Sequence, residues 1–187
     1  MKNEKLFSQM RNRGLSTENF RKNAEILSFS LARKTFAKIP ASKRSKVALI
    51  MILRSALAML SAFLKYFPKA PVGFIGLKRN ELTAVAKKYY ENLPKLSKSS
   101  IVVIPDPMLG TAGSFINVLK ILIKKGVNPK NVYFTGFIAA EDPGIEKVAR
   151  LIPKENLTFL AIDPKLDSKY YITPGLGDFG DRYFGYK

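Results

Sequence analysis

The sequence predicts an α/β fold in which a mostly parallel sheet is covered by helices on both faces. Five apolar runs of four to eight residues alternate along the chain with segments of helical pattern. The runs are apolar throughout instead of alternating with polar residues, as is typical of strands buried on both faces. With 187 residues, 47% of them hydrophobic, the chain is long enough to bury the core that such a sheet needs.

The first half of the chain predicts one long helix and two strands. Ser16 or Thr17 can cap a helix whose apolar residues follow helical spacing and which ends before Pro40. Residues 82–93 fit either a helix or an extended arm. A basic loop over residues 41–46 and a strand over 47–53 follow the first helix. A second helix over 56–66 and a second strand over 72–77 come next.

The second half continues the alternation and ends in a tail rich in glycine and aromatic residues. Gly126 has the position of a residue that ends a helix in the left-handed conformation. The predicted elements are strands over 101–104, 132–139 and 157–162, and helices over 115–125 and 143–151. We therefore expect one domain in three parts. They are a helical, basic N-terminal segment (1–46), a core (47–165) and a tail (166–187).

The composition excludes several kinds of chemistry. Neither cysteine nor histidine occurs in the chain. Disulfides, thiolate nucleophiles and thiolate-bound zinc are therefore excluded, as is catalysis by a histidine base. Any metal must be a hard cation on oxygen ligands, such as Mg²⁺.

The charge is strongly positive and unevenly distributed. The net charge is +18, and residues 1–100 hold 21 Lys and Arg against 5 Asp and Glu. Residues 101–187 hold 11 against 9. Such a basic half attracts polyanions, either a phosphorylated small molecule or RNA. The alternative is a lysine-rich surface whose only partner is water.

One segment resembles a membrane span in its hydropathy. Residues 47–64 are nearly all apolar, but Arg54 lies in the middle, where a charge is costly in lipid. A β-branched run followed by an alanine-rich one fits a strand, a turn and a helix better. Residues 1–23 are polar and show no secretory signal, so we expect a cytoplasmic protein that does not enter the membrane.

Residues 101–114, IVVIPDPMLGTAGS, combine a carboxylate with a glycine-containing turn between a predicted strand and helix. The carboxylate of Asp106 can bind sugar hydroxyls. The small and hydroxyl residues from Thr111 to Ser114 can hold a phosphate at the helix N-terminus. This order of residues indicates a ligand that is both a sugar and a phosphate.

Two arginines follow the first two predicted strands, and ligands of parallel sheets bind at the carboxyl ends of strands. Arg54 fits a clamp for a phosphate or diphosphate. It fits a buried ion pair with Asp106 or Asp163 equally well. Arg79 fits either a similar contact or a solvated loop.

The tail from Tyr171 to Lys187, YITPGLGDFGDRYFGYK, could enclose a planar base between backbone groups and apolar side chains. Within it, residues 178–180 spell the Asp-Phe-Gly motif of protein kinases. Kinases also need a histidine in their catalytic loop, so the absence of histidine excludes that interpretation.

Taken together, these motifs resemble those of the uracil phosphoribosyltransferase family. The family's DPMLATGGS is similar to residues 106–114, and its YIxPGLGDxGDRxFGxK is similar to residues 171–187. Its PILRAGLGM, GLYRNEET and LRDKxTxxxxFR are similar to residues 51–59, 76–83 and 10–21. The resemblance implies a type I phosphoribosyltransferase fold with a small C-terminal hood.

The resemblance also implies a reaction and its site. Uracil would receive the 5-phosphoribosyl group of 5-phosphoribosyl diphosphate (PRPP), giving UMP and pyrophosphate. Asp106, Asp178 and Arg54 would be the catalytic residues. PRPP would contact Arg54, Arg79, Asp106, Pro107, Met108, Leu109, Gly110, Thr111, Ala112, Gly113, Ser114 and Asp178. Uracil would contact Tyr171, Ile172, Gly177, Asp178 and Phe179. Mg²⁺ would be bound mainly through PRPP, with Asp178 as the one protein ligand considered. Family members form dimers or larger assemblies, so a homo-oligomer is implied, as is GTP binding.

The chain departs from the family pattern where PRPP would bind. Ala56, Ala58 and Ala112 replace family glycines, and Leu82 and Val85 stand where carboxylates are usual. Because glycine adopts unusual backbone conformations more readily than alanine, these changes could weaken PRPP binding. They leave a second hypothesis open: a protein of the same fold with weakened catalysis that binds a pyrimidine nucleotide or RNA in a regulatory role.

Overall fold

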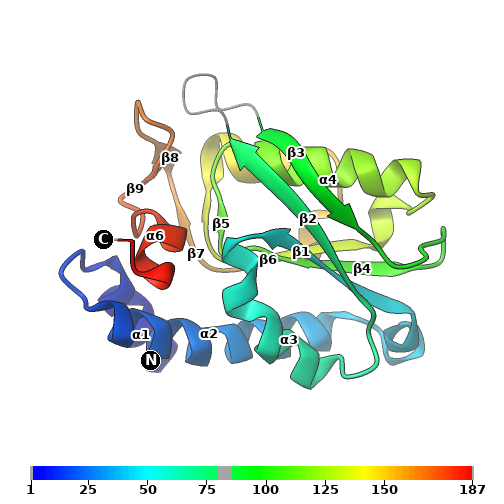
Figure 1. Ribbon diagram of the computed structural model, residues 1–187, viewed down its shortest axis with the longest axis horizontal. Coiled ribbons are helices and arrows are strands. Elements are labelled where there is room, and N and C mark those ends of the chain that lie inside the picture. Colours follow the sequence, from blue (N-terminus) through cyan, green and yellow to red (C-terminus); the bar gives the residue numbers. More distant parts are fainter. Residues whose placement is uncertain (1, 80–85, 187) are drawn as a thin grey trace.

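The computed structural model describes residues 2–79 and 86–186, and its centre is a mixed, mostly parallel sheet (Figure 1). Strand β3 (Ala86–Asn92) pairs antiparallel with β2 at one edge. The short β5 (Met108–Leu109) pairs with the end of β6. The parallel strands lie in the order β2 (Val72–Arg79), β1 (Val47–Leu53), β4 (Ile101–Pro105), β6 (Val132–Ala140) and β7 (Leu157–Asp163).

Helices cover both faces, and each face has its own hydrophobic core. Side chains of β1 alternate between the two: Met51 belongs to one core and Ile52 to the other. This two-sided burial explains why the strand sequence is apolar throughout. One face carries α1 (Lys2–Arg11), α2 (Thr17–Lys38), α3 (Leu60–Tyr66) and α6 (Phe179–Phe184). The other carries α4 (Gly113–Lys124), as Figure 1 shows, and the core contacts place α5 (Glu146–Ala149) there too.

The local signals place most element boundaries correctly. Ser16 caps α2, and its hydroxyl accepts a hydrogen bond from the Asn19 N–H at 3.3 Å. Gly126 follows α4 with a φ of 87°. Of the two alternatives for residues 82–93, the described part, 86–92, is extended.

Several segments differ from the expectation. The predicted helix over 56–66 is instead a 3₁₀ helix (Ser55–Met59) followed by the shorter α3. Residues 41–46 form a 3₁₀ helix and not an open loop. The predicted helix over 143–151 is instead a π turn (Glu141–Ile145) followed by the short α5. Helices α1 and α6 were not predicted. Over the described residues, none of the helices is both long and apolar enough to cross a bilayer.

Candidate active site at the carboxyl ends of the strands

Three segments that lie far apart in the sequence meet at the carboxyl end of the sheet, at the left of Figure 1. A Cβ atom at Gly110 would lie 3.8 Å from the Tyr170 carbonyl oxygen, so the 106–114 loop borders the hairpin of β8 (Lys165–Leu166) and β9 (Ile172–Thr173). A Cβ atom at Gly180 would lie 3.2 Å from Ser55 Oγ, so the tail also borders the turn after β1. The 106–114 loop, the hairpin and the turn after β1 therefore all border the same end of the sheet.

The 106–114 loop is held against β6. The Asp106 N–H donates to the Thr135 carbonyl at 3.0 Å, and the Phe137 N–H donates to the Pro107 carbonyl at 2.9 Å. A Cβ atom at Gly136 would overlap with the Asp106 carbonyl oxygen, so glycine is required where the two segments pass each other. The loop backbone is thus placed before any ligand arrives.

The end of this loop forms the N-terminus of α4. Ala112 has a φ of 65° and a ψ of 2°, and its carbonyl accepts from the Ile116 N–H at 2.9 Å. The Gly113 N–H points to Thr111 Oγ1 at 3.3 Å. Because the first N–H groups of a helix have no acceptor within the helix and lie at its positive end, this terminus suits a phosphate.

Replacing Ala112 with glycine is expected to change the free energy of unfolding by no more than about 0.5 kcal/mol. Relief of the left-handed conformation gains about 1–2 kcal/mol. The greater freedom of glycine in the unfolded chain offsets about 0.4–1 kcal/mol of this gain, and loss of the buried methyl group offsets about 0.8 kcal/mol more. Urea unfolding measures the difference. Ala37→Gly, on the exposed side of α2, is the control and should cost about 1 kcal/mol. A loss of stability as large as that of Ala37→Gly would contradict the strain assigned to this position.

The turn after β1 corrects one expectation. Ala56 and Ala58 lie in a 3₁₀ helix (Ser55–Met59), and neither has a positive φ. Both methyl groups are buried in the core that α2 also lines. Alanine therefore suits this backbone, and the conformational argument against these two residues does not hold in this structure.

Arg54 is exposed at the end of β1, next to the C-terminal residues. Its Nη1 donates to Tyr186 Oη at 3.0 Å, and its guanidinium lies 5.2 Å from the centre of the Tyr186 ring. Asp163, one of the two carboxylates considered as its ion-pair partner, is bound by Arg11 instead. Arg79 is the last residue of β2, and its backbone pairs with Ala86. Leu82 and Val85 lie outside the described residues.

The tail holds the residues expected at the base. Tyr171 is exposed, whereas Ile172 is buried. Gly177 has a φ of 85°, in the region that favours glycine. The Asp178 carboxylate caps α6 by accepting from the Asp181 N–H at 2.9 Å.

The ring of Phe179 packs in the protein core. It is 2% exposed and stacks on Phe137 and Tyr183, at 5.3 and 5.6 Å between ring centres. Phe20 packs against it from α2 at 5.3 Å. The backbone of Phe179 therefore remains the part best suited to a base contact.

An ion pair between the half-buried Arg11 and the buried Asp163, beside the tail, was not predicted. Arg11 binds Asp163 with both guanidinium ends, at 2.7 and 2.6 Å, and the Gly175 N–H donates to the same carboxylate at 2.7 Å. Burial raises the pKa of Asp163, but the hydrogen bonds from Arg11 and Gly175 and the charge of Arg11 outweigh it and lower the pKa. The only sequence signal was the similarity of residues 10–21 to a family motif, which gives no partner for Arg11.

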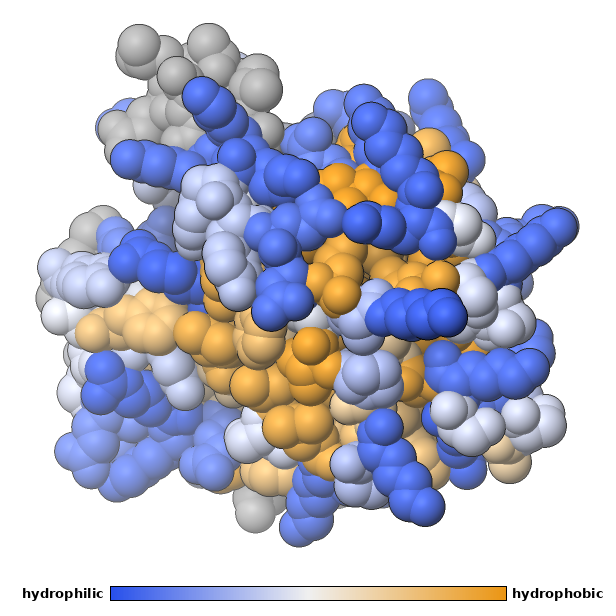
Figure 2. Space-filling model, turned by 45° about the vertical axis from the view of Figure 1, so that its right-hand side comes forward, coloured by the Kyte–Doolittle hydropathy of each residue, from blue (hydrophilic) through white to orange (hydrophobic). Residues whose placement is uncertain are grey.

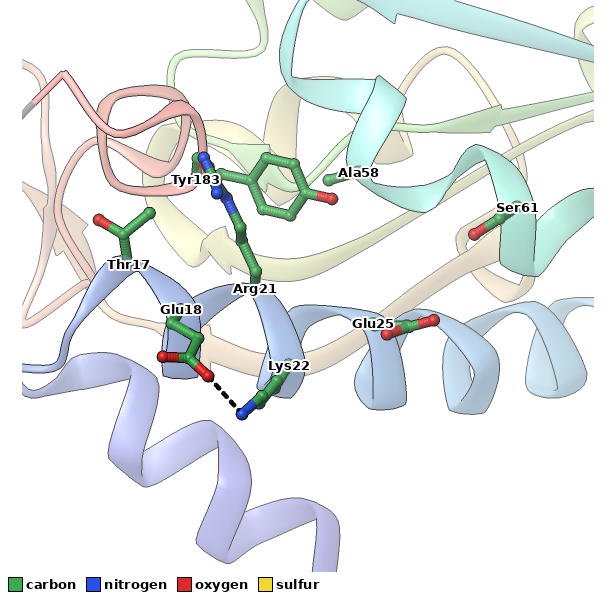
Figure 3. A pocket seen from close by; sticks show the side chains of 8 residues that line it. All are labelled: Thr17, Glu18, Arg21, Lys22, Glu25, Ala58, Ser61 and Tyr183. Carbon is green, nitrogen blue, oxygen red and sulfur yellow. Dashed lines mark hydrogen bonds and ion pairs between the residues drawn. The ribbon is translucent and has the colours of Figure 1, made fainter.

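A separate hollow of about 450 Å³ lies between α2, the turn after β1, and α6 (Figure 3). Its wall carries both signs of charge, including the ion pair of Glu18 and Lys22 at 2.6 Å. Tyr183 and Ala58 border it. None of the residues expected to contact uracil or PRPP lines it, so it is distinct from the site at the strand ends.

The described residues contain no group of three or more Asp or Glu side chains that could enclose a metal ion. Asp178 already uses its carboxylate as a helix cap. This donor set suits a cation that brings most of its oxygen ligands with it, as a Mg²⁺–diphosphate complex does.

Comparison with known proteins assigns the family. The family model described as uracil phosphoribosyltransferase matches residues 41–186. The chain belongs to the uracil phosphoribosyltransferase family. A uracil phosphoribosyltransferase from Campylobacter concisus is 44% identical over 140 residues, which are 75% of this chain and 66% of that protein. One from Ureaplasma urealyticum is 42% identical over 144 residues, 77% of this chain and 68% of that protein. The match thus spans about two thirds of the length of these relatives.

Solved structures agree with this family's fold. A protein structure from Aquifex aeolicus has a TM-score of 0.85 and 31% identity, and the match covers 97% of this chain and 93% of that one. The APRTase of Giardia lamblia, complexed with 9-deazaadenine, has a TM-score of 0.58 and 13% identity over 74% of this chain and 79% of that one. This second likeness is one of fold alone. The sequence-based expectation of a type I phosphoribosyltransferase fold is confirmed.

Proposed function

We propose that the protein transfers the 5-phosphoribosyl group of PRPP to uracil. The bond between ribose C1′ and the diphosphate oxygen breaks, a bond between C1′ and uracil N1 forms, and the N1 proton leaves. The products are UMP and pyrophosphate. The observation that carries the proposal is that the 106–114 loop borders the β8–β9 hairpin, which leads into the tail, at the strand ends, within a chain of this family.

The 106–114 loop would hold the ribose 5-phosphate half of PRPP. The backbone N–H groups from Ala112 to Ser114 and the Thr111 and Ser114 hydroxyls would bind the 5-phosphate. Asp106, directly after β4, would accept hydrogen bonds from the ribose hydroxyls and stabilise positive charge that develops at C1′. The loop is fixed by its bonds to β6, so it can orient C1′ at little further cost.

Arg54 would bind the diphosphate that leaves. Its guanidinium suits two phosphate oxygens, and it would exchange the Tyr186 hydroxyl for them. Mg²⁺, when bound through the diphosphate, supplies neutralisation of the charge on the leaving group. Asp178 is the protein carboxylate we assign to this complex, and Arg79 would contact the same end of PRPP.

The tail would hold uracil. The backbone groups of Gly177 and Phe179 would bind the polar edge of the ring, and Ile172 and Tyr171 would border it. Phe179 would act through its backbone, because its ring packs in the core. Since no cysteine or histidine is available, catalysis would rest on orientation and charge stabilisation.

The regulatory alternative rested partly on Ala56 and Ala58. Their ordinary backbone and buried methyl groups remove that support. We therefore propose that the protein is an enzyme and not a regulatory protein. We place it in the cytoplasm, where salvage of free bases supplies nucleotides.

We also propose that the protein forms a homodimer or larger assembly. One face of the molecule gathers hydrophobic side chains at its centre, with hydrophilic ones around them (Figure 2). Independently of that view, apolar side chains that are exposed or half-buried lie on the turn after β1, α3 and β2, namely Leu57, Leu60, Leu64, Val72 and Phe74. Sedimentation equilibrium measures the molecular mass in solution. A monomer at all concentrations would contradict the proposed assembly.

UMP formation from uracil, PRPP and Mg²⁺ tests the function. We expect turnover with uracil and at least about 100-fold less with hypoxanthine, because a site built to bind one set of polar groups rejects a base that lacks them. Two assays, one with radiolabelled uracil and one with radiolabelled hypoxanthine, measure these rates. Salt-sensitive RNA binding without turnover would instead favour the regulatory role.

A further inference from the structure

The base loop, residues 175–179, is attached to the N-terminal segment by two arginines. Arg11 donates to the Gly175 carbonyl at 2.9 Å while it binds Asp163, and Asp163 accepts from the Gly175 N–H. Both polar backbone groups of Gly175 are therefore fixed by the same ion pair. Arg182 donates to the Leu176 carbonyl at 2.6 Å and to the Asn12 carbonyl at 2.6 Å.

The loop has little freedom to move without these contacts being broken. Gly175 has a φ of 63°, and a Cβ atom there would overlap with the Ile172 carbonyl oxygen. A Cβ atom at Gly177 would overlap with the guanidinium of Arg13. The N-terminal segment thus packs directly on the two glycines that shape the loop.

A buried ion pair is poor evidence of a role in stability alone. Asp163 is 4% exposed, and the free energy needed to remove its charge from water cancels much of its attraction to Arg11. What the pair provides is geometry, because a bidentate guanidinium–carboxylate contact fixes distance and angle together. Here the ion pair fixes the backbone of Gly175, which lies two residues before Gly177.

We propose that Arg11 and Asp163 are positioning residues that hold the base loop in the conformation that binds uracil. They do not touch the substrate; they fix Gly175 and thereby the backbone of Gly177 and Phe179. This inference rests on the proposed function. Arg11 lies outside residues 41–186, the range that the family model matches, so that match does not bear on its role.

Three variants test the role. Asp163→Asn keeps the shape of the side chain and removes the charge. Arg11→Lys keeps the charge and loses the bidentate contact. The double variant Arg11→Met with Asp163→Asn leaves neither charge buried without a partner, so it guards against a failure to fold. Glu18→Gln, which removes the exposed ion pair with Lys22, is the matched control.

We expect these variants to change the KM for uracil and to leave the KM for PRPP nearly unchanged. Asp163→Asn and the double variant should raise the KM for uracil about 10-fold, less than the ~100-fold that a 1 Å misplacement can cost. The KM for PRPP should stay within about 2-fold, because the 106–114 loop is held by β6 instead. The KM of Arg11→Lys for uracil should lie between those of these variants and that of the wild type. Glu18→Gln should match the wild type.

Hydrogen exchange of residues 172–179 gives a second readout that does not need activity. Asp163→Asn and the double variant should speed exchange there about 10-fold or more, because the charged contact that holds Gly175 is lost, while exchange in β4 and β6 is unchanged. Equal increases in both KM values, or unchanged exchange in the loop, would overturn the inference. Failure of the wild type to form UMP would overturn the proposed function and the role in uracil binding, while exchange would still decide whether the pair holds the loop.

Discussion

Asp106→Asn is expected to lower the kcat of UMP formation by about 100- to 1000-fold, the cost of removing one preorganised electrostatic contact in other enzymes. The carboxylate follows β4 directly, and its backbone is fixed by the Thr135 carbonyl. Asparagine keeps the size of the side chain and can still accept one hydrogen bond from ribose. It cannot stabilise positive charge at C1′, so turnover should suffer more than the KM for PRPP.

Steady-state kinetics with PRPP and uracil varied separately measures this effect. Glu146→Gln, an exposed carboxylate at the start of α5, is the control and should leave kcat unchanged. A variant that keeps its kcat and shows only a raised KM for PRPP would limit Asp106 to substrate binding.

Phe179→Ala is expected to destabilise the protein by about 3–5 kcal/mol, the cost of removing a buried phenyl ring. The ring lies between Phe137 and Tyr183 and also meets Phe20, so its loss would open a cavity where α2, β6 and α6 join. Denaturant unfolding followed by circular dichroism measures the loss. Tyr89→Ala, at a side chain that is 60% exposed, should change stability by no more than about 0.5 kcal/mol.

The sequence alone predicts a different outcome for Phe179→Ala, mainly a raised KM for uracil. The core packing of the ring makes loss of stability the first effect, with weaker uracil binding as a consequence of a disturbed loop. Unchanged stability with a raised KM would show that the ring faces the base after all.

The strands and the turn that leads from β4 into α4 could be predicted because their signals are local. Strand β1 begins and ends where its apolar run does, and the carboxylate-turn-helix order of residues 106–114 is contained in nine residues. The helix cap of Ser16 and the terminal Gly126 are local signals of the same kind.

The rest depends on contacts between distant residues. Arg11 and Asp163 are 152 positions apart, and no pattern near either one indicates the other. Phe179 lies in a glycine-rich tail that is typical of a binding loop, and only the arrangement of Phe20 and Phe137 around it reveals a core position. The left-handed conformation of Ala112 is set by the junction with α4, since alanine itself disfavours it.

The distance along the chain between Arg11 and Gly175 has a consequence for synthesis on the ribosome. The arginine is translated 152 positions before Asp163 and 164 positions before Gly175. A nascent chain can fold the sheet around β1 and β4 long before this contact can form. The loop that contains Gly175 would therefore be fixed only after these strands are already folded.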